Sequence, residues 1–141
     1  MAQVGLLEDN IRIAKLCATM LHYAGHEVTI YECAQQCLQA LLAGGKVPDS
    51  MQPMHNDRSL PVEVLILDLH LPDIDGIEVL RHLQAHPRTQ SLPLIFCTAA
   101  TDAEIARALS IVPRASLVEK PFKLQTLISA ISSVLKPSSS I

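Results

Sequence analysis

The chain has 141 residues, which suits one domain with a single hydrophobic core. Hydrophobic residues make up 49% and charged residues 18% of it, a globular composition that excludes an intrinsically disordered chain. The net charge of −3 argues against a surface that binds nucleic acid by neutralising phosphates, and the apolar runs are too short to span a membrane. We therefore expect a soluble, cytoplasmic protein without direct contact to nucleic acid or membrane.

Short apolar runs alternate with amphipathic helical segments along the chain. In chain order, the sequence predicts a strand over 2–7, a helix whose apolar positions run from 13 to 24, a strand over 27–31, a helix over 34–43, a strand over 62–67, a helix over 76–85, a strand over 93–98, a helix over 102–110, a strand over 115–119 and a helix over 124–135. Strands that alternate with helices in this way predict an α/β fold, with a parallel sheet covered by helices on both faces. Helical spacing places Leu16 on the apolar face of the first helix, and Gly25 stands where a left-handed helix stop is expected. Asp75 is expected to cap the helix over 76–85.

Polar side chains stand where the central strands end: Glu8 and Asp9, Asp68, Thr98, and Lys120. Because the carboxyl ends of parallel strands share one edge of a sheet, we expect these groups to lie close together. Two like charges about 4 Å apart repel by about 4 kcal/mol at an effective dielectric of about 20, so one lysine does not balance three carboxylates. A bound Mg²⁺ ion or raised pKa values would balance them. The alternative is a structural salt bridge between Lys120 and one acid, with the other acids solvated.

Five motifs occur in order along nearly the whole chain: Glu8-Asp9, Asp68 with Pro72, Asp75 and Gly76 behind it, Thr98-Ala99, and Lys120-Pro121-Phe122. These motifs and their spacing resemble the receiver domain of two-component response regulators. The resemblance implies a flavodoxin-like fold, a single doubly wound five-stranded parallel sheet in the order 2-1-3-4-5 with five helices. We expect this domain over 1–136, with an insert at 44–61, and a flexible tail over 137–141.

The resemblance also implies a phosphoacceptor site. Asp68 would accept a phosphoryl group from a sensor histidine kinase or a histidine phosphotransfer protein. Asp9 would bind Mg²⁺ directly and Glu8 through water, and the backbone carbonyl of His70 would complete the coordination. The domain would thus catalyse its own Mg²⁺-dependent phosphorylation and dephosphorylation, and would then switch the surface that it presents to a downstream protein or output domain.

The remaining roles concern the phosphoryl oxygens and the switch. Lys120 would pair with those oxygens and Thr98 would hydrogen-bond to one of them, while the Lys120–Pro121 peptide is cis in the family. Leu117 stands where many relatives carry an aromatic switch residue. We therefore expect switching that is weaker or that relies on the loop around 99–101. The alternative for Leu117 is a partly buried strand residue without a role in switching.

The role of His70 and the function of the protein each have an alternative interpretation. The side chain of His70 either influences the phosphoryl lifetime or is an exposed loop histidine. The chain could be a receiver-like docking module that phosphorylation does not regulate. A phosphatase or hydrolase on a related sheet would need an acid two positions after the nucleophile, where His70 stands instead. The sequence also allows a homodimer.

The insert at 44–61 is long for a helix-to-strand connection, where two to six residues are typical. We expect a mobile surface loop there, in preference to a partner-docking element built on Met51 and Met54. The four cysteines fall inside apolar patterns and lack metal-site spacing, so we expect reduced cysteines that act as small core residues.

Overall fold

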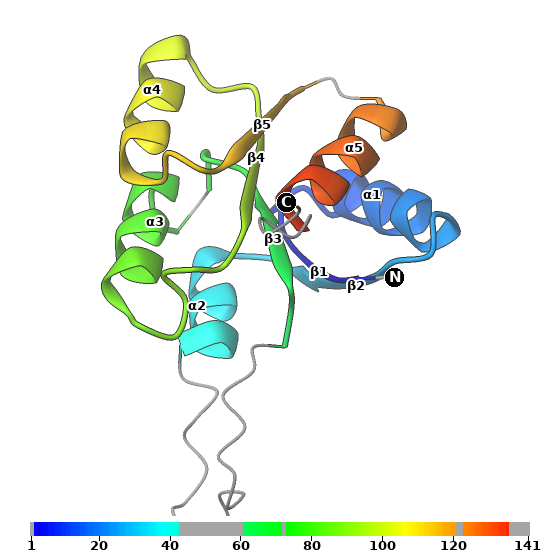
Figure 1. Cartoon of the computed structure of the whole chain (residues 1–141), viewed down its shortest axis with the longest axis horizontal. Coiled ribbons are helices and arrows are strands. Elements are labelled where there is room, and N and C mark those ends of the chain that lie inside the picture. The colour runs from blue at the N-terminus through cyan, green and yellow to red at the C-terminus, as the bar shows by residue number, and fades with distance from the viewer. Residues whose placement is uncertain (1, 43–60, 72, 121–122, 136–141) are drawn as a thin grey trace, which may run out of the picture.

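The computed structural model of the chain describes residues 2–42, 61–71, 73–120 and 123–135. Strands and helices alternate through these residues (Figure 1). In chain order, the elements are β1 (Gln3–Leu7), α1 (Ile11–Tyr23), β2 (Glu27–Tyr31), α2 (Ala34–Leu42), β3 (Val64–Leu67), α3 (Gly76–Ala85), β4 (Leu94–Thr98), α4 (Asp102–Ile111), β5 (Ser116–Glu119) and α5 (Leu124–Leu135).

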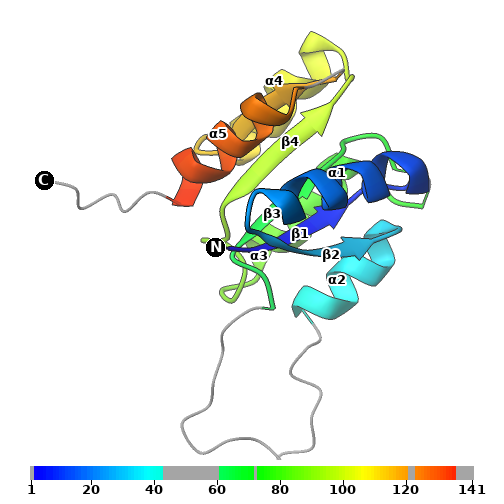
Figure 2. The same ribbon diagram turned by 90° about the vertical axis from the view of Figure 1, so that its right-hand side faces the viewer.

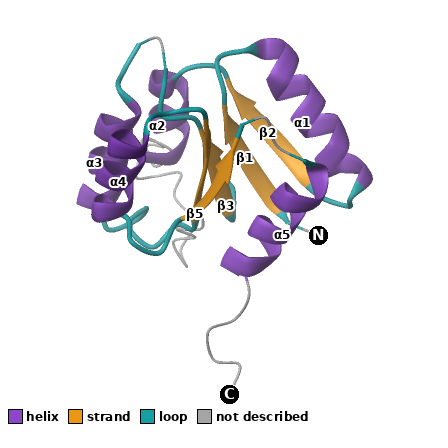
Figure 3. Cartoon of the chain, turned by 90° about the horizontal axis from the view of Figure 1, so that it is seen from above, coloured by secondary structure: helices purple, strands orange, loops and turns teal. Residues whose placement is uncertain are grey.

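The five described strands form one parallel sheet in the order β2-β1-β3-β4-β5, which confirms the predicted fold class and strand order. Parallel neighbours need crossover connections, and the helices supply them. Figures 1 and 3 show α2, α3 and α4 on one face of the sheet and α1 and α5 on the other, and Figure 2 shows the second face from outside. β3 is the middle strand, so both of its faces are covered.

Alternation along the central strands creates two separate hydrophobic cores, because successive side chains point to opposite faces. Leu65 and Leu67 of β3 pack with residues of α2, α3 and α4, whereas Val64 and Ile66 pack with residues of α1 and α5. Burying a side chain of this size contributes about 1.5–3 kcal/mol, so a slip of one residue would be costly on both faces. The two cores therefore fix the register of the strand that ends in Asp68.

Two sequence predictions need small corrections. β3 begins at Val64 and not at 62, although Glu63 N already donates to Gln3 O at 2.7 Å, so pairing with β1 extends beyond the strand's start. Helical spacing predicts Leu16 on the inward face of the first helix, but it is 57% exposed. The stripe that α1 buries runs through Ala14, Cys17 and Leu21, at spacings of three and four, and Leu16 lies beside it.

Two acids of the segment between β3 and α3 hold the starts of two different helices. Asp75 caps its own helix, α3, by accepting a hydrogen bond from Ile77 N at 3.0 Å, as predicted. Asp73 caps α2, which begins far away in the sequence: its two carboxylate oxygens accept from Ala34 N at 3.1 Å and Gln35 N at 3.0 Å. This second cap could not be inferred from local sequence.

Gly76 begins α3 in close contact with the same segment. A Cβ atom at this position would lie 2.5 Å from Leu69 Cα and 2.6 Å from Leu69 O, and Gly76 N donates to Leu69 O at 3.1 Å. Only glycine allows this approach. At the end of α1, Gly25 has a φ of 97°, which confirms the predicted left-handed helix stop.

Some predictions concern residues outside the described ranges. They are the insert at 44–61 apart from its last residue, the tail at 137–141, Pro72 and the Lys120–Pro121 peptide. Within the described part of the chain, no helix combines the length and the apolar character needed to cross a membrane.

Candidate phosphoacceptor site

The sheet itself positions the polar groups at its carboxyl edge. Asp68 follows β3 directly, and its backbone N–H donates to Leu7 O at 3.2 Å, so the ladder between β1 and β3 continues through it. The same register places Glu8 beside Asp68. Lys120 follows β5 and donates from its backbone N–H to Thr98 O at 3.1 Å. Each of these side chains therefore leaves a rigid strand end and not a free loop.

Lys120 joins two carboxylates at this edge. Its Nζ lies 2.6 Å from Glu8 Oε1 and 2.9 Å from Asp68 Oδ2. The side chains of Lys120, Glu8 and Asp68 are only 16%, 5% and 10% exposed. Burial alone would lower the pKa of Lys120, but the hydrogen bonds and negative charges of Glu8 and Asp68 outweigh it and hold that pKa well above its ordinary value. The ammonium is therefore charged at every physiological pH.

The second oxygen of Asp68 accepts two hydrogen bonds. Thr98 Oγ1 donates to Asp68 Oδ1 at 2.8 Å, and His70 N donates to the same oxygen at 3.0 Å. Thr98 is 1% exposed, and its Oγ1 in turn accepts from Ala100 N at 3.1 Å. Asp68, Thr98 and Lys120, which the sequence marked as candidate catalytic residues, are thus in direct contact.

Glu8, Asp9 and Asp68 form an acidic cluster. Each offers one carboxylate oxygen, and these oxygens lie within 4.8 Å of one another. Asp9 is exposed, whereas Glu8 and Asp68 are buried. The donor set consists of oxygen atoms, which are the ligands that Mg²⁺ prefers, so the residues present fit that ion. Lys120 is the ammonium in contact with the cluster, and its single positive charge leaves an excess of negative charge for a cation to balance.

His70 contacts a residue that the sequence pattern did not single out. Its Nε2 lies 2.9 Å and 3.0 Å from the two carboxylate oxygens of Glu104, in the first turn of α4. Hydrogen bonds from Thr101 N, from His70 and from the Thr101 hydroxyl lower the pKa of Glu104 to about 2. The spacing Thr101-x-x-Glu104 signals a capping box in the sequence, but its pairing with His70 depends on the fold.

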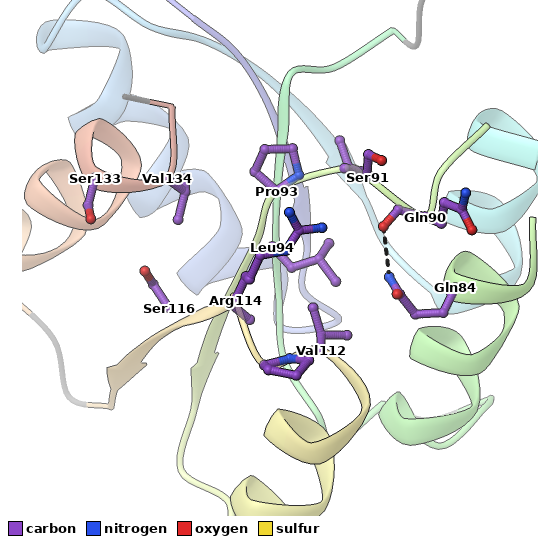
Figure 4. A pocket seen from close by; sticks show the side chains of 13 residues that line it. Gln84, Gln90, Ser91, Pro93, Leu94, Val112, Arg114, Ser116, Ser133 and Val134 are labelled. Atoms are coloured by element: carbon purple, nitrogen blue, oxygen red, sulfur yellow. Dashed lines mark hydrogen bonds between the residues drawn. The ribbon is translucent and has the colours of Figure 1, made fainter. Parts of the chain in front are cut away.

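A hollow lies at the opposite, amino edge of the sheet (Figure 4). It has a volume of about 420 Å³ and opens between the start of β4, the α4–β5 connection and the end of α5. Arg114 is the charged residue among the described residues that line it, and these include no acid, histidine or cysteine. The hollow therefore lacks the groups that metal binding or phosphoryl transfer needs, and the carboxyl edge is the candidate site.

Two further predictions can be compared with the structure. Cys17, Cys37 and Cys97 are buried, Cys33 is half-buried, and all four are free thiols. Leu117 lies in β5 with 36% of its surface exposed.

Comparison with known proteins identifies the family. A family model described as the response regulator receiver domain matches residues 4–132. The transcriptional regulatory protein CreB of Escherichia coli (strain K12) is 33% identical over 94% of this chain and 50% of its own length. The transcriptional regulatory protein TrcR of Mycobacterium tuberculosis is 28% identical over 97% of this chain and 46% of its own length. The chain thus spans about half the length of these curated relatives.

Solved structures share the fold. The chemotaxis protein CheY4 of Vibrio cholerae has a TM-score of 0.74 at 23% identity, covering 96% of this chain and 99% of that one. The Francisella response regulator 1452 receiver domain has a TM-score of 0.71 at 19% identity, covering 95% and 96%. The family match, the strand order and the polar carboxyl edge agree, and the chain belongs to the response regulator receiver domain family.

Proposed function

We propose that the chain is a phosphoacceptor switch in which Asp68 accepts a phosphoryl group from a phosphohistidine of a sensor kinase or of a phosphotransfer protein. The observation that carries the proposal is the setting of Asp68. Its nearly buried carboxylate touches the Lys120 ammonium on one oxygen and the Thr98 hydroxyl on the other, beside two further carboxylates. This is the setting of a nucleophile held ready for an anionic group.

In this proposal, a carboxylate oxygen of Asp68 forms a bond to phosphorus while the P–N bond of the donor histidine breaks. Lys120, which stays charged, is placed to pair with the phosphoryl oxygens as they approach Asp68. Thr98 donates its hydroxyl hydrogen to Asp68 before phosphorylation, and it can rotate to donate to a phosphoryl oxygen afterwards. The rigid strand ends keep these groups in place, which reduces the entropy that the reaction must lose.

The acidic cluster would hold Mg²⁺. Asp9 and Asp68 would bind the ion directly, and the backbone carbonyl of His70 would complete the set. Glu8 would act through water, as the resemblance to receiver domains implies. When bound, the ion offsets the repulsion between an anionic nucleophile and an anionic phosphoryl group.

The output is also part of the proposal. The curated relatives carry the names of transcriptional regulatory proteins and are about twice as long as the matched region, so we propose that a downstream protein or an attached output domain reads the switch. A receiver-like docking module that ignores phosphate is the second candidate, and phosphorylation by a small donor separates the two.

The test is incubation with acetyl phosphate and Mg²⁺, followed by intact-mass measurement. Wild type should gain the mass of one phosphoryl group, and Asp68→Asn should gain none. Chelating Mg²⁺ should lower the yield. Glu78→Gln, which removes an exposed carboxylate of α3 that is not part of the acidic cluster, is the matched control and should behave as wild type. A wild type that gains no mass would favour the docking module. An Asp68→Asn variant that gains as much mass as wild type would show that the acceptor is another residue.

A further inference from the structure

Two chains of hydrogen bonds lead from Asp68 to the start of α4. The first runs through β4: Thr98 Oγ1 donates to Asp68 Oδ1 at 2.8 Å and accepts from Ala100 N at 3.1 Å. Ala100 directly precedes Thr101, the N-cap residue of α4. A displacement of Thr98 would therefore be transmitted through Ala100 and Thr101 to the first turn of α4.

The second chain runs through the segment after β3. His70 N donates to Asp68 Oδ1 at 3.0 Å, and the His70 ring contacts Glu104 at 2.9 Å and 3.0 Å. Glu104 accepts in turn from Thr101 N at 2.9 Å and from Thr101 Oγ1 at 3.0 Å. The two chains thus begin at one oxygen atom and meet at one N-cap, which closes a ring around the β4–α4 connection.

The direction of the His70 side chain shows which part of the structure its imidazole contacts. The ring nitrogen that contacts Glu104 points toward α4, and a shallow hollow between the β3–α3 segment and α4 is lined by His70, Glu104 and neighbouring residues. Asp68 does not line it among the described residues. The imidazole is therefore engaged with the helix and not with the space around the phosphoacceptor carboxylate.

We propose that Glu104 is a positioning residue: by holding His70, it keeps the first turn of α4 against the β3–α3 segment and opposes the displacement of the β4–α4 connection that phosphorylation of Asp68 favours. The inference rests on the proposed function. A phosphoryl group adds charge and acceptor oxygens that attract Thr98, and Thr98 pulls on Ala100. The His70–Glu104 pair acts against this pull, because it fixes the helix from the other side.

The solvent exposure of the His70 and Glu104 side chains sets the expected size of their effect on switching. The side chains of His70 and Glu104 are 55% and 39% exposed, so the pair is a surface contact. Contacts of this kind shift a two-state equilibrium by about two- to fivefold. The pair therefore shifts the equilibrium modestly toward the resting conformation and does not prevent switching.

The experiment uses amide NMR spectra of the 99–105 segment, with Mg²⁺ and beryllium fluoride as the phosphoryl mimic. Glu104→Ala and His70→Ala should each move these resonances, without the mimic, toward their positions in mimic-saturated wild type. By linkage, both should bind the mimic about two- to fivefold more tightly. The double variant should equal either single one, because Glu104 acts through His70. Glu104→Gln, which keeps an oxygen acceptor, should lie between wild type and Glu104→Ala.

Thr101→Ala is the structural control, because it removes the N-cap hydroxyl but leaves the His70–Glu104 pair. It should not move the resonances along the line toward the mimic-bound state. If Thr101→Ala has the effect of Glu104→Ala, or if the two single effects add in the double variant, the proposal is wrong and Glu104 is only a helix cap. If the mimic and acetyl phosphate leave wild type unchanged, the proposed function fails, and this inference fails with it. If both act on wild type and Glu104→Ala responds as wild type does, the inference alone fails.

Discussion

Lys120 and Glu8 lie 112 positions apart in the chain, yet the Lys120 ammonium is 2.6 Å from the Glu8 carboxylate. The contact joins the residue after β5 to the residue after β1, and Asp68, which follows the middle strand, shares the same ammonium at 2.9 Å. Since the three side chains are nearly buried, water screens these charges weakly. Lys120 is therefore expected to matter for stability as well as for the proposed phosphoryl transfer.

Lys120→Met should lower the free energy of unfolding by about 2–4 kcal/mol, because it leaves two neighbouring carboxylates without their shared ammonium. Urea denaturation measures this loss. Lys123→Met is the matched control, since Lys123 is exposed, and it should stay within about 0.5 kcal/mol of wild type. Equal stability of the two variants would show that Lys120 does not balance the acids.

Mg²⁺ should raise the thermal unfolding midpoint in a saturable way, because an ion that binds only the folded cluster stabilises it. At a concentration of 100 times Kd the gain is about 2.7 kcal/mol. Asp9→Asn should lose most of this response, since it removes the exposed carboxylate of the cluster. Glu78→Gln should keep the response. An equal midpoint shift in Asp9→Asn and wild type would place the ion elsewhere.

Gly76→Ala should destabilise the fold by about 1–3 kcal/mol, as an added methyl group does where the structure has no room for it. Its Cβ would lie 2.5 Å from the Leu69 backbone, and backbone atoms cannot move aside as a flexible side chain can. Glu78→Ala, at an exposed position of the same helix, is the control and should change the unfolding free energy little. Denaturation of both variants checks the prediction, and an unchanged Gly76→Ala would contradict the close approach.

Glu104 should titrate with a pKa of about 2, against an ordinary value of 4.5, when its carboxyl group is followed by NMR. Because folding lowers this pKa, the stabilisation is fully present above about pH 4.5 and is lost as the pH falls toward 2. His70→Ala should raise the pKa only in part, since the hydrogen bonds from Thr101 remain. A pKa near 4.5 in wild type would mean that these bonds do not persist in solution.

Alkylation of the native protein should distinguish Cys33 from the three buried cysteines. Burial raises the pKa of Cys17 to about 11 and those of Cys37 and Cys97 to about 12, so at pH 8 these thiols are protonated and covered. Iodoacetamide should therefore label only the half-buried Cys33 in the native protein and all four cysteines in guanidinium chloride. Intact mass counts the labels, and rapid native labelling of two or more thiols would contradict the packing.

The sequence predicted those features that depend on local pattern. Apolar periodicity predicted the bounds of the described strands and helices to within two residues. The polar groups at the strand ends indicated where the candidate site lies, because a parallel sheet gathers its carboxyl ends at one edge. The strand order came from the resemblance to receivers and not from the pattern. Asp75 and Gly25 were identified through capping and left-handed turns, which are also local.

Features that depend on which elements meet in space were missed. Leu16 fits the apolar spacing because helical periodicity gives a wide stripe, and only the packing of α1 shows where the stripe ends. Glu104 could be recognised as part of a capping box, but its contact with His70 requires knowing that α4 begins beside the segment after β3. The cap that Asp73 provides for α2 is non-local in the same way.

The segment between β3 and α3 contacts the starts of three helices: Asp73 holds α2, Asp75 holds α3, and His70 reaches α4. Surface connections usually tolerate insertions and deletions, but a change of length here would misplace several of these contacts at once. A designer who transplants a docking specificity onto this scaffold should therefore keep this connection intact and introduce diversity elsewhere.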